Sequence, residues 1–217
     1  MPRKTMSVLN STKLPFNKSY QLAQAIAMLI AIVLFILSYI FGRDTLFLWL
    51  NKNLGTFADN FFSYFTYLAE GWIWIPYLLV LVMLLKKDAA FIVINFLSST
   101  LLTQVPKNLI WPNVNRPIAS DIPISKIHMV PSVEVHTYNS FPSGHTATAF
   151  TLFLITVYFF PNKKVLLAGC LYALVCGYSR IYLGQHFPLD IAGGIVAALL
   201  SVALSIQFRN KLFKKPM

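Results

Sequence analysis

Residues 142–145 read Pro-Ser-Gly-His and directly precede an apolar run in which a helix is expected to begin. The start of a helix offers free backbone N–H groups and a positive dipole end, and both favour an anion. Ser143 and Gly144 are therefore candidate phosphate-binding residues. His145 follows them and can act as a general acid that protonates the oxygen leaving such a phosphate.

A second motif places a histidine four residues before a carboxylate. His186 lies just before the expected start of the last helix, because Pro188 suits a first helical turn, and Asp190 lies within that turn. A carboxylate at this spacing can reach the imidazole and fix its tautomer, which leaves the other ring nitrogen free to attack. His186, Asp190 and His145 are thus the candidate catalytic residues.

Three basic residues, Lys107, Arg116 and Arg180, can hold the phosphate on which these histidines would act. Arginine offers paired donors that match phosphate oxygens. Three cations can also neutralise the phosphoryl charge without the help of a metal ion. The sequence therefore predicts neither a metal site nor another cofactor.

The chain that must position these residues is strongly apolar, with 57% of its 217 residues hydrophobic and only 12% charged. The apolar residues fall into long runs of the length that a helix needs to cross a membrane. We expect an all-α membrane protein with one domain over residues 1–217 and six transmembrane helices in one bundle. The second span is expected to have Gly71–Leu85 as its body, with Phe61–Leu68 lengthening it or lying along the membrane surface. The six expected spans cover about residues 20–41, 62–85, 89–106, 144–161, 165–180 and 187–208.

The net charge of +11 follows from an uneven distribution of basic residues along the chain. Twelve of the 18 lysines and arginines flank span ends on the side that both termini share. Basic residues mark the cytoplasmic side, so both termini are expected in the cytoplasm. Because this asymmetry accounts for the whole excess, we do not expect nucleic acid as a partner.

Alternation of the spans brings Lys107, His145, Arg180 and His186 to span ends on the opposite, outer side. Ionisable residues at membrane depth are costly and suggest a functional site. The active site is therefore expected to face the periplasm or the outside. The compact frame suits a multi-pass protein of a bacterial inner membrane.

The connection formed by residues 106–142 is expected on the outer side and contains six of the 12 prolines of the chain. Proline fixes φ and removes a donor, so this segment should be irregular. We expect it to cover the site, since long loops of this kind are usually functional, although it could also be a simple tether between two helices. His128 and His136 in this loop have no partner at a recognisable spacing and are not expected to be catalytic.

Two cysteines, Cys170 and Cys176, lie in one expected span. They fit no metal or redox spacing, so they are expected to serve in packing.

Together these motifs resemble the signature of the type-2 phosphatidic acid phosphatase superfamily, which reads Lys-x6-Arg-Pro, then Pro-Ser-Gly-His, then Ser-Arg-x5-His-x3-Asp. Residues 142–145 match the second part and residues 179–190 match the third part completely, including both gaps. The resemblance implies a helical bundle with the site at the outer helix ends. It implies that His186 forms a phosphohistidine intermediate, that Asp190 orients it and that His145 serves the leaving group. The phosphate would be held by Lys107, Arg116, Ser143, Gly144 and Arg180.

The first part of the signature departs from the family pattern. Eight residues rather than six separate Lys107 from Arg116, and Leu109 stands where the usual spacing would put the lysine. The two extra residues fall near Trp111-Pro112, where a loop can absorb them. Lys107 remains the candidate because no other lysine is near enough upstream.

The function that this pattern favours is a membrane phosphatase that hydrolyses a lipid phosphomonoester or diphosphate without a metal. Undecaprenyl diphosphate, a lipid A phosphate, phosphatidylglycerol phosphate and phosphatidic acid all fit, and the sequence neither chooses among them nor indicates an oligomeric state. A lipid phosphotransferase could use the same intermediate, but no dedicated acceptor motif is visible. An anion transporter would place charges near the membrane midplane, whereas here they cluster at span ends. A soluble vanadium-dependent haloperoxidase shares the signature, but six spans argue against one.

Overall fold

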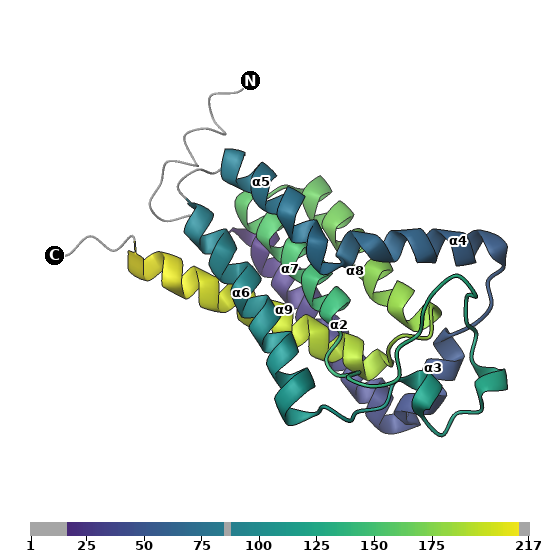
Figure 1. Cartoon of the computed structure of the whole chain (residues 1–217). Helices are drawn as coiled ribbons and strands as arrows, with labels where there is room; N and C mark the ends of the chain where they lie inside the picture. The colour runs from purple at the N-terminus through teal and green to yellow at the C-terminus, as the bar shows by residue number, and fades with distance from the viewer. Residues whose placement is uncertain (1–16, 85–87, 213–217) are drawn as a thin grey trace.

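The computed structural model describes residues 17–84 and 88–212, which are helical with irregular connections and contain no strand (Figure 1). The loop between α6 and α7 lies with α3 and α4 at one end of the bundle, whereas α5 and α9 end at the other (Figure 1). The helices are α2 (Lys18–Phe41), α3 (Arg43–Leu50), α4 (Thr56–Phe65), α5 (Trp74–Leu84), α6 (Ala89–Val105), α7 (Gly144–Phe159), α8 (Lys163–Tyr182) and α9 (Pro188–Leu212).

Four helical segments in the described ranges are long and apolar enough to cross a membrane on their own. They are Lys18–Phe41, Ala89–Ile110, Lys163–Tyr182 and Pro188–Lys211. A bent pair, Thr56–Ala69 with Gly71–Leu84, makes a fifth if it is taken as one span. The described residues thus offer four or five such spans rather than the six that the sequence predicts.

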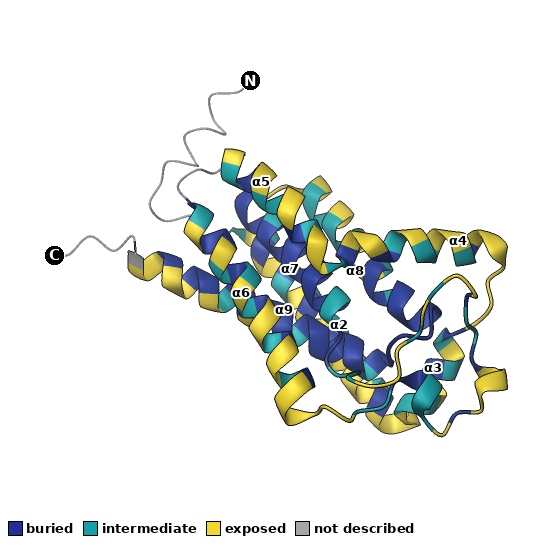
Figure 2. Ribbon diagram, viewed as in Figure 1, coloured by how far each residue is buried: buried dark blue, intermediate teal, exposed yellow. Residues whose placement is uncertain are grey.

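The expected span over residues 144–161 corresponds to α7, which has 16 residues. A helix of that length is about 24 Å long, shorter than the hydrocarbon core of a typical bilayer. The helix can be shorter than the bilayer core because it is a central helix. Of its 16 residues 13 are buried, so protein rather than lipid surrounds it (Figure 2). A helix that is apolar all round is expected in such a place.

The expected second span is broken at Glu70, and its two halves meet at 52°. Glu70 has an extended backbone, with φ −72° and ψ 160°, between two short 3-10 turns, η1 (Thr66–Ala69) and η2 (Gly71–Ile73). The half that contains α4 extends away from the bundle, while α5 runs alongside it (Figure 1). The break brings the end of η1 to the loop end of the bundle, where the candidate site lies.

Small residues allow the helices around α9 to approach one another closely. Ala23, Ala27 and Ala31 recur every four residues on α2, are at most 1% exposed and face the interior, where α2 packs against α9. Gly194 of α9 lies against the start of α7, since a Cβ there would be 2.9 Å from Cβ of Thr146. Close packing through small residues is typical of membrane helices, which gain no hydrophobic free energy from leaving lipid.

The loop over residues 106–142 is irregular, as its prolines predict. It contains only short turns: a π-helical turn η4 (Pro106–Ile110) that continues α6, and two 3-10 turns, η5 (Pro117–Ala119) and η6 (Ile124–Lys126). The segment over residues 43–60, in contrast, is largely helical, because α3 and the first half of α4 lie within it.

Candidate active site

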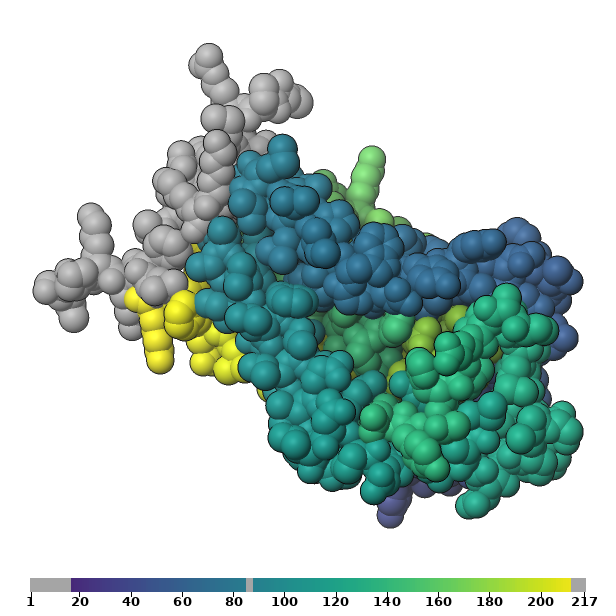
Figure 3. Space-filling model, in the orientation of Figure 1, coloured from purple at the N-terminus to yellow at the C-terminus, as the bar shows by residue number. Residues whose placement is uncertain are grey.

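A cavity of about 470 Å³ opens at the loop end of the bundle, between the broken helix, α6, the start of α7 and the end of α8. In Figure 3 it lies in the hollow between the α4–α5 segment and α6 with its loop, where green residues of α7 and α8 are visible. Its lining includes six of the eight predicted site residues: Lys107, Arg116, Gly144, His145, Arg180 and His186. The other two, Ser143 and Asp190, are buried next to lining residues rather than in the cavity wall.

His186 and Asp190 form a buried pair at the start of α9. The two residues are 1% and 2% exposed, and Nδ1 of His186 lies 3.2 Å from Oδ2 of Asp190. If Nδ1 carries the ring proton and donates a hydrogen bond to the carboxylate, the lone pair of Nε2 is left free, as a nucleophile requires. The i, i+4 spacing around Pro188 thus brings the two side chains together as the sequence predicts.

Burial and the surrounding cations keep the His186 imidazole neutral. Burial lowers the pKa of His186 well below its usual value of 6.5, and the positive charges of Arg116, Lys107 and Arg180 lower it further. A neutral imidazole retains the lone pair that attacks phosphorus. The cations that suit a phosphate therefore also favour the neutral form of this candidate nucleophile.

Asp190 is held by two further donors. Its Oδ2 accepts hydrogen bonds from the backbone N–H of Phe187 at 2.9 Å and from the hydroxyl of Ser140. Ser140 is fully buried and belongs to the loop, 50 residues away along the chain. The sequence pattern does not single out Ser140, because only the folded loop brings it to Asp190.

Arg116 lies in the cavity wall through contacts with the loop and with the residue before His186. Its Nε donates to the carbonyl of Tyr138 at 2.9 Å, and its Nη1 donates to Oε1 of Gln185 at 2.9 Å and to the Gln185 carbonyl at 3.2 Å. Gln185 in turn donates to the carbonyl of Glu134 at 2.7 Å. These bonds fix the guanidinium beside His186 and join the loop to the corner between α8 and α9.

Arg180, in the last turn of α8, reaches the broken helix. The residue is 6% exposed, and its Nη1 donates to the hydroxyl of Thr66 in η1 at 2.6 Å. Its buried Nε has no hydrogen-bond partner within the described ranges. A buried guanidinium with an unused donor is an effective anion ligand.

Lys107 occupies the π-helical turn that ends α6 and is only 9% exposed, whereas Leu109, at the usual family spacing, is 77% exposed. A π-helical turn accommodates extra residues without breaking the helix. Here that turn places Lys107 in the wall of the main cavity and of an adjoining polar cavity of about 530 Å³. The structure thus brings Lys107, rather than Leu109, to the candidate site.

Ser143 caps α7: its Oγ accepts from the backbone N–H of Thr146 at 3.4 Å and from the Thr146 hydroxyl at 3.0 Å. Its own N–H donates to the carbonyl of Asp190 at 2.9 Å, which ties the start of α7 to the start of α9. Gly144 and His145 follow in the first turn and line the cavity, as expected for a helix start that receives an anion.

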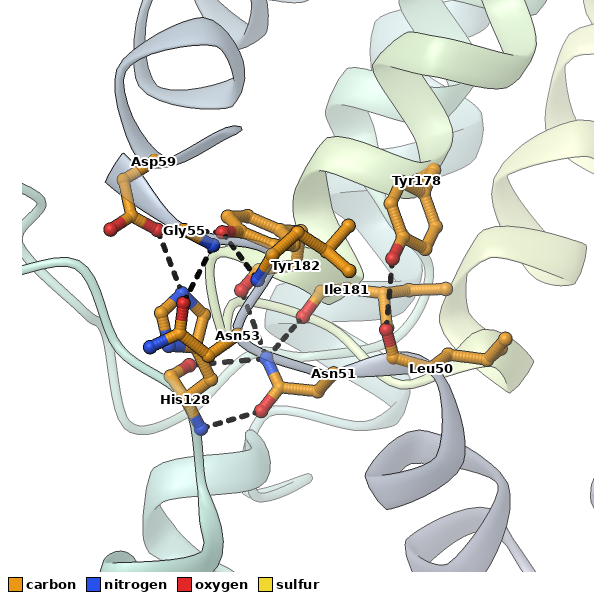
Figure 4. A network of polar contacts seen from close by, with 10 residues as sticks. Leu50, Asn51, Asn53, Gly55, Asp59, His128, Tyr178, Ile181 and Tyr182 are labelled. Atoms are coloured by element: carbon orange, nitrogen blue, oxygen red, sulfur yellow. Dashed lines mark hydrogen bonds and ion pairs between the residues drawn. The ribbon is translucent and has the colours of Figure 1, made fainter. Parts of the chain in front are cut away.

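His128 belongs to a separate polar cluster that joins the loop to the ends of α3 and α8 (Figure 4). Its Nε2 lies 2.9 Å from Oδ1 of Asp59, which also accepts from the hydroxyl of Tyr182 at 2.6 Å. Asn51 accepts from the backbone N–H of His128 at 2.7 Å and donates to three carbonyls, those of His128, Ile181 and Tyr182. This cluster, which we call the Asn51 clasp, holds the loop against the end of α8. His136 lines both cavities.

Comparison with known proteins agrees with this arrangement. The family model described as the PAP2 superfamily matches residues 88–214, more than half of the chain. The chain belongs to the PAP2 superfamily. All eight predicted site residues lie inside the PAP2 match, whereas the broken helix precedes it.

The chain is also similar to individual curated proteins and to a solved structure. Undecaprenyl-diphosphatase BcrC of Bacillus subtilis is 34% identical over 34% of this chain, and the match spans 37% of that relative. Lipid A 4'-phosphatase of Bacteroides thetaiotaomicron is 29% identical, with 70% of this chain and 69% of the relative covered. The crystal structure of Aquifex aeolicus LpxE aligns with a TM-score of 0.64 at 29% identity, covering 75% of this chain and 93% of that one. With its several apolar helices, the chain is a multi-pass PAP2 membrane protein.

Proposed function

We propose that the chain is a lipid phosphatase that hydrolyses a phosphomonoester or diphosphate through a phosphohistidine on His186. The observation that carries the proposal is the His186–Asp190 pair facing a cavity that Lys107, Arg116 and Arg180 also line. The relatives named above, an undecaprenyl diphosphatase and a lipid A phosphatase, act on phosphates attached to lipids. The proposed substrate class is therefore a lipid phosphate or diphosphate.

In the proposed first step Nε2 of His186 attacks phosphorus while the bond to the leaving oxygen breaks. The electron pair of that bond stays on the leaving oxygen, which takes a proton from His145. Lys107, Arg116 and Arg180 stabilise the charge on the other phosphoryl oxygens. In the second step water attacks phosphorus and gives a proton to His145, while the P–Nε2 bond breaks with its electron pair staying on His186. Inorganic phosphate leaves, and neutral His186 is regenerated.

The lining of the cavity fits a substrate with a polar head and an apolar tail. Away from the basic residues, the wall is formed by Trp74 and Phe96 together with hydroxyl-bearing residues of α6. Such a mixed wall can accept the part of a lipid that adjoins its phosphate. The two catalytic steps need no metal, so we expect the activity to persist in a chelator.

The test is phosphate release by the full-length protein in detergent from a panel of lipid monophosphates and diphosphates, with EDTA present. We expect release from at least one lipid, its loss in His186→Ala, and an acid-labile, alkali-stable phosphoprotein in rapid-quench samples of the native enzyme. His186→Ala must remain folded by thermal unfolding for its loss to count. Release that survives in His186→Ala would contradict the mechanism, and no release from any lipid would contradict the function.

A further inference from the structure

The break in the second span places the carboxylate of Glu70 next to His145, the proposed general acid. Oε1 of Glu70 lies 3.9 Å from Nε2 of His145, and the two side chains are 36% and 24% exposed. Nε2 of His145 is itself inaccessible to solvent and has no hydrogen-bond partner among the described residues. Leaving a buried polar atom without a hydrogen bond costs free energy. A small movement of the Glu70 carboxylate toward Nε2 of His145 would supply the missing bond.

The segment immediately before Glu70 is held to α8, and the segment after it borders the cavity. Immediately before it, η1 is held to α8 by the bond from Arg180 to Thr66 and by the hydroxyl of Tyr172, which donates to the carbonyl of Leu68. Immediately after it, Gly71 and Trp74 line the cavity. An unbroken helix over these residues would keep Glu70 helical, whereas its extended backbone lies at the corner between the two halves.

We propose that Glu70 is the positioning residue of His145 and forms with it a second histidine–carboxylate pair, opposite His186–Asp190. This inference rests on the proposed phosphatase function. When substrate binds, a closure of about 1 Å converts the 3.9 Å separation into a hydrogen bond from Nε2–H to Glu70, since catalytic hydrogen bonds are often long before substrate is bound. Nδ1 of His145 then carries the proton that the leaving oxygen takes.

The two carboxylates have different tasks in this scheme. Asp190 keeps a neutral imidazole in the tautomer that attacks, whereas Glu70 stabilises the protonated His145 before the first step and again when it accepts the proton of water. Glu70 lies outside residues 88–214, the range of the family match, so only the carboxylate of this pair comes from the segment that precedes the match.

The test compares two substrates with the same alkyl chain: dodecyl phosphate, whose alkoxide leaving group needs a proton, and a dodecyl-substituted nitrophenyl phosphate, whose leaving group does not. We expect Glu70→Gln to lower kcat for the alkyl ester about 10- to 100-fold. The rate of phosphoryl transfer from the aryl ester should fall less than about 3-fold, because only the alkyl ester depends on a general acid. The aryl reaction is followed as the burst of nitrophenol, so that the later hydrolysis of the phosphoenzyme does not contribute.

Glu70→Asp should recover part of the alkyl-ester activity, since it keeps the carboxylate. In a His145→Ala background Glu70→Gln should cause no further loss, because residues that act as one unit are not additive. Asp121→Asn, a change to an exposed carboxylate of the loop, is the control and should match the native enzyme on both esters.

Equal losses on the two esters, or a full further loss in the His145→Ala background, would show that Glu70 acts only in folding and would overturn the inference. In that case the proposed function would still stand if His186→Ala abolished both reactions. A native enzyme that cleaves neither these esters nor any lipid phosphate would overturn the function and the inference together.

Discussion

At the scale of single residues, the side chains of the candidate site are held in place by hydrogen bonds to neighbouring residues. Asp190 orients His186, and Ser140 and the Phe187 N–H hold Asp190. Arg116 is held by Gln185 and by the Tyr138 carbonyl. Preorganisation of this kind matters because a reacting group displaced by about 1 Å can lose two orders of magnitude in rate.

Removing the Ser140 hydroxyl should test how far Asp190 depends on its partners. We expect Asp190→Asn to lower kcat by roughly 10³- to 10⁴-fold, because it favours the wrong tautomer of His186. Ser140→Ala leaves the carboxylate in place with one donor fewer, so its kcat should fall only about 10-fold, the equivalent of about 1.4 kcal/mol. Steady-state kinetics on the best lipid substrate provide the measurement.

Ser120→Ala is the matched control for that comparison. Ser120 lies in the same loop, and its hydroxyl donates to the Pro117 carbonyl within its own turn. A loss in Ser120→Ala equal to that in Ser140→Ala would mean that loop order, not the bond to Asp190, is what the Ser140 variant reports.

The lowered pKa of His186 predicts how its protonation affects stability as the pH falls. The folded protein keeps this imidazole neutral, whereas the unfolded chain binds a proton below the usual pKa of 6.5. The contribution of His186 to the free energy of unfolding is therefore complete above pH 6.5. It is lost as the pH falls from 6.5 toward the pKa of the folded state, by at most about 1.4 kcal/mol per pH unit. Thermal unfolding of the native protein and His186→Gln at pH 7.5, 6.5 and 5.5 measures this effect.

Glutamine does not titrate, yet it keeps a side-chain N–H for Asp190. We expect the native protein to lose more stability than His186→Gln between pH 6.5 and 5.5, and the two to run parallel above pH 6.5. All other groups, including His145, are common to both proteins. Parallel curves throughout would mean that His186 accepts a proton in the folded state as readily as in the unfolded chain.

At the scale of elements, the loop end of the bundle is assembled from segments that are distant in sequence. The Asn51 clasp joins the end of α3, the loop at His128 and the end of α8. Tyr178 adds a hydrogen bond from its hydroxyl to the Leu50 carbonyl at 3.0 Å (Figure 4). The loop thereby lies over the corner that carries Arg180 and His186.

Replacing Asn51 should destabilise the protein more than a comparable change nearby. Asn51→Ala removes four hydrogen bonds and leaves buried backbone groups without partners, for which we expect a loss of about 2–4 kcal/mol in the free energy of unfolding. Asn53→Ala removes one exposed bond to the Gly55 N–H and should cost less than about 1 kcal/mol. Denaturant unfolding in detergent, followed by tryptophan fluorescence, would measure both.

A loss in Asn53→Ala as large as that in Asn51→Ala would contradict the role of the clasp. We also expect kcat to decrease in Asn51→Ala, even at temperatures where the variant is fully folded, because the loop that Asn51 holds carries Arg116 and Ser140.

At the scale of the whole molecule, the basic last turn of α9 and the candidate site lie at opposite ends. The predicted site residues gather at the loop end, whereas Arg209 and Lys211 lie in the last turn of α9 at the other end, where Nε of Arg209 pairs with Oδ1 of Asp88. With the positive-inside rule, this polarity supports a periplasmic or external site and a cytoplasmic C-terminal end. The same argument for the N-terminus rests mainly on residues outside the described ranges.

Sidedness can be measured by cysteine labelling. In a protein with Cys170 and Cys176 replaced by serine, Asp121→Cys in the loop should react with a membrane-impermeant maleimide in intact cells. Lys163→Cys, at the start of α8, should react only after the membrane is opened, since the two positions lie at opposite ends of the bundle. The reverse pattern would place the site in the cytoplasm and contradict the proposed orientation.

The helical class, the irregular loop and the local chemistry of the two histidine motifs could be predicted from the amino-acid sequence alone. These features depend on short-range physics: apolar run length, the effect of proline on the backbone, and the i, i+4 spacing that brings Asp190 to His186. Family membership also followed from the motifs at residues 142–145 and 179–190. Six of the predicted residues line one cavity because the order and direction of the helices already brought them to one end.

Which helices lie in the centre, and which partners complete the site, depends on long-range packing and is visible only in the folded protein. A run of apolar residues looks the same whether it faces lipid or protein, so the buried position of α7 and its short length could not be derived from the pattern. The break at Glu70 depends on packing, since η1 is held by Tyr172 and Arg180, more than 100 residues away. Ser140, Gln185, Thr66 and Glu70 reach the site through contacts that no local spacing encodes.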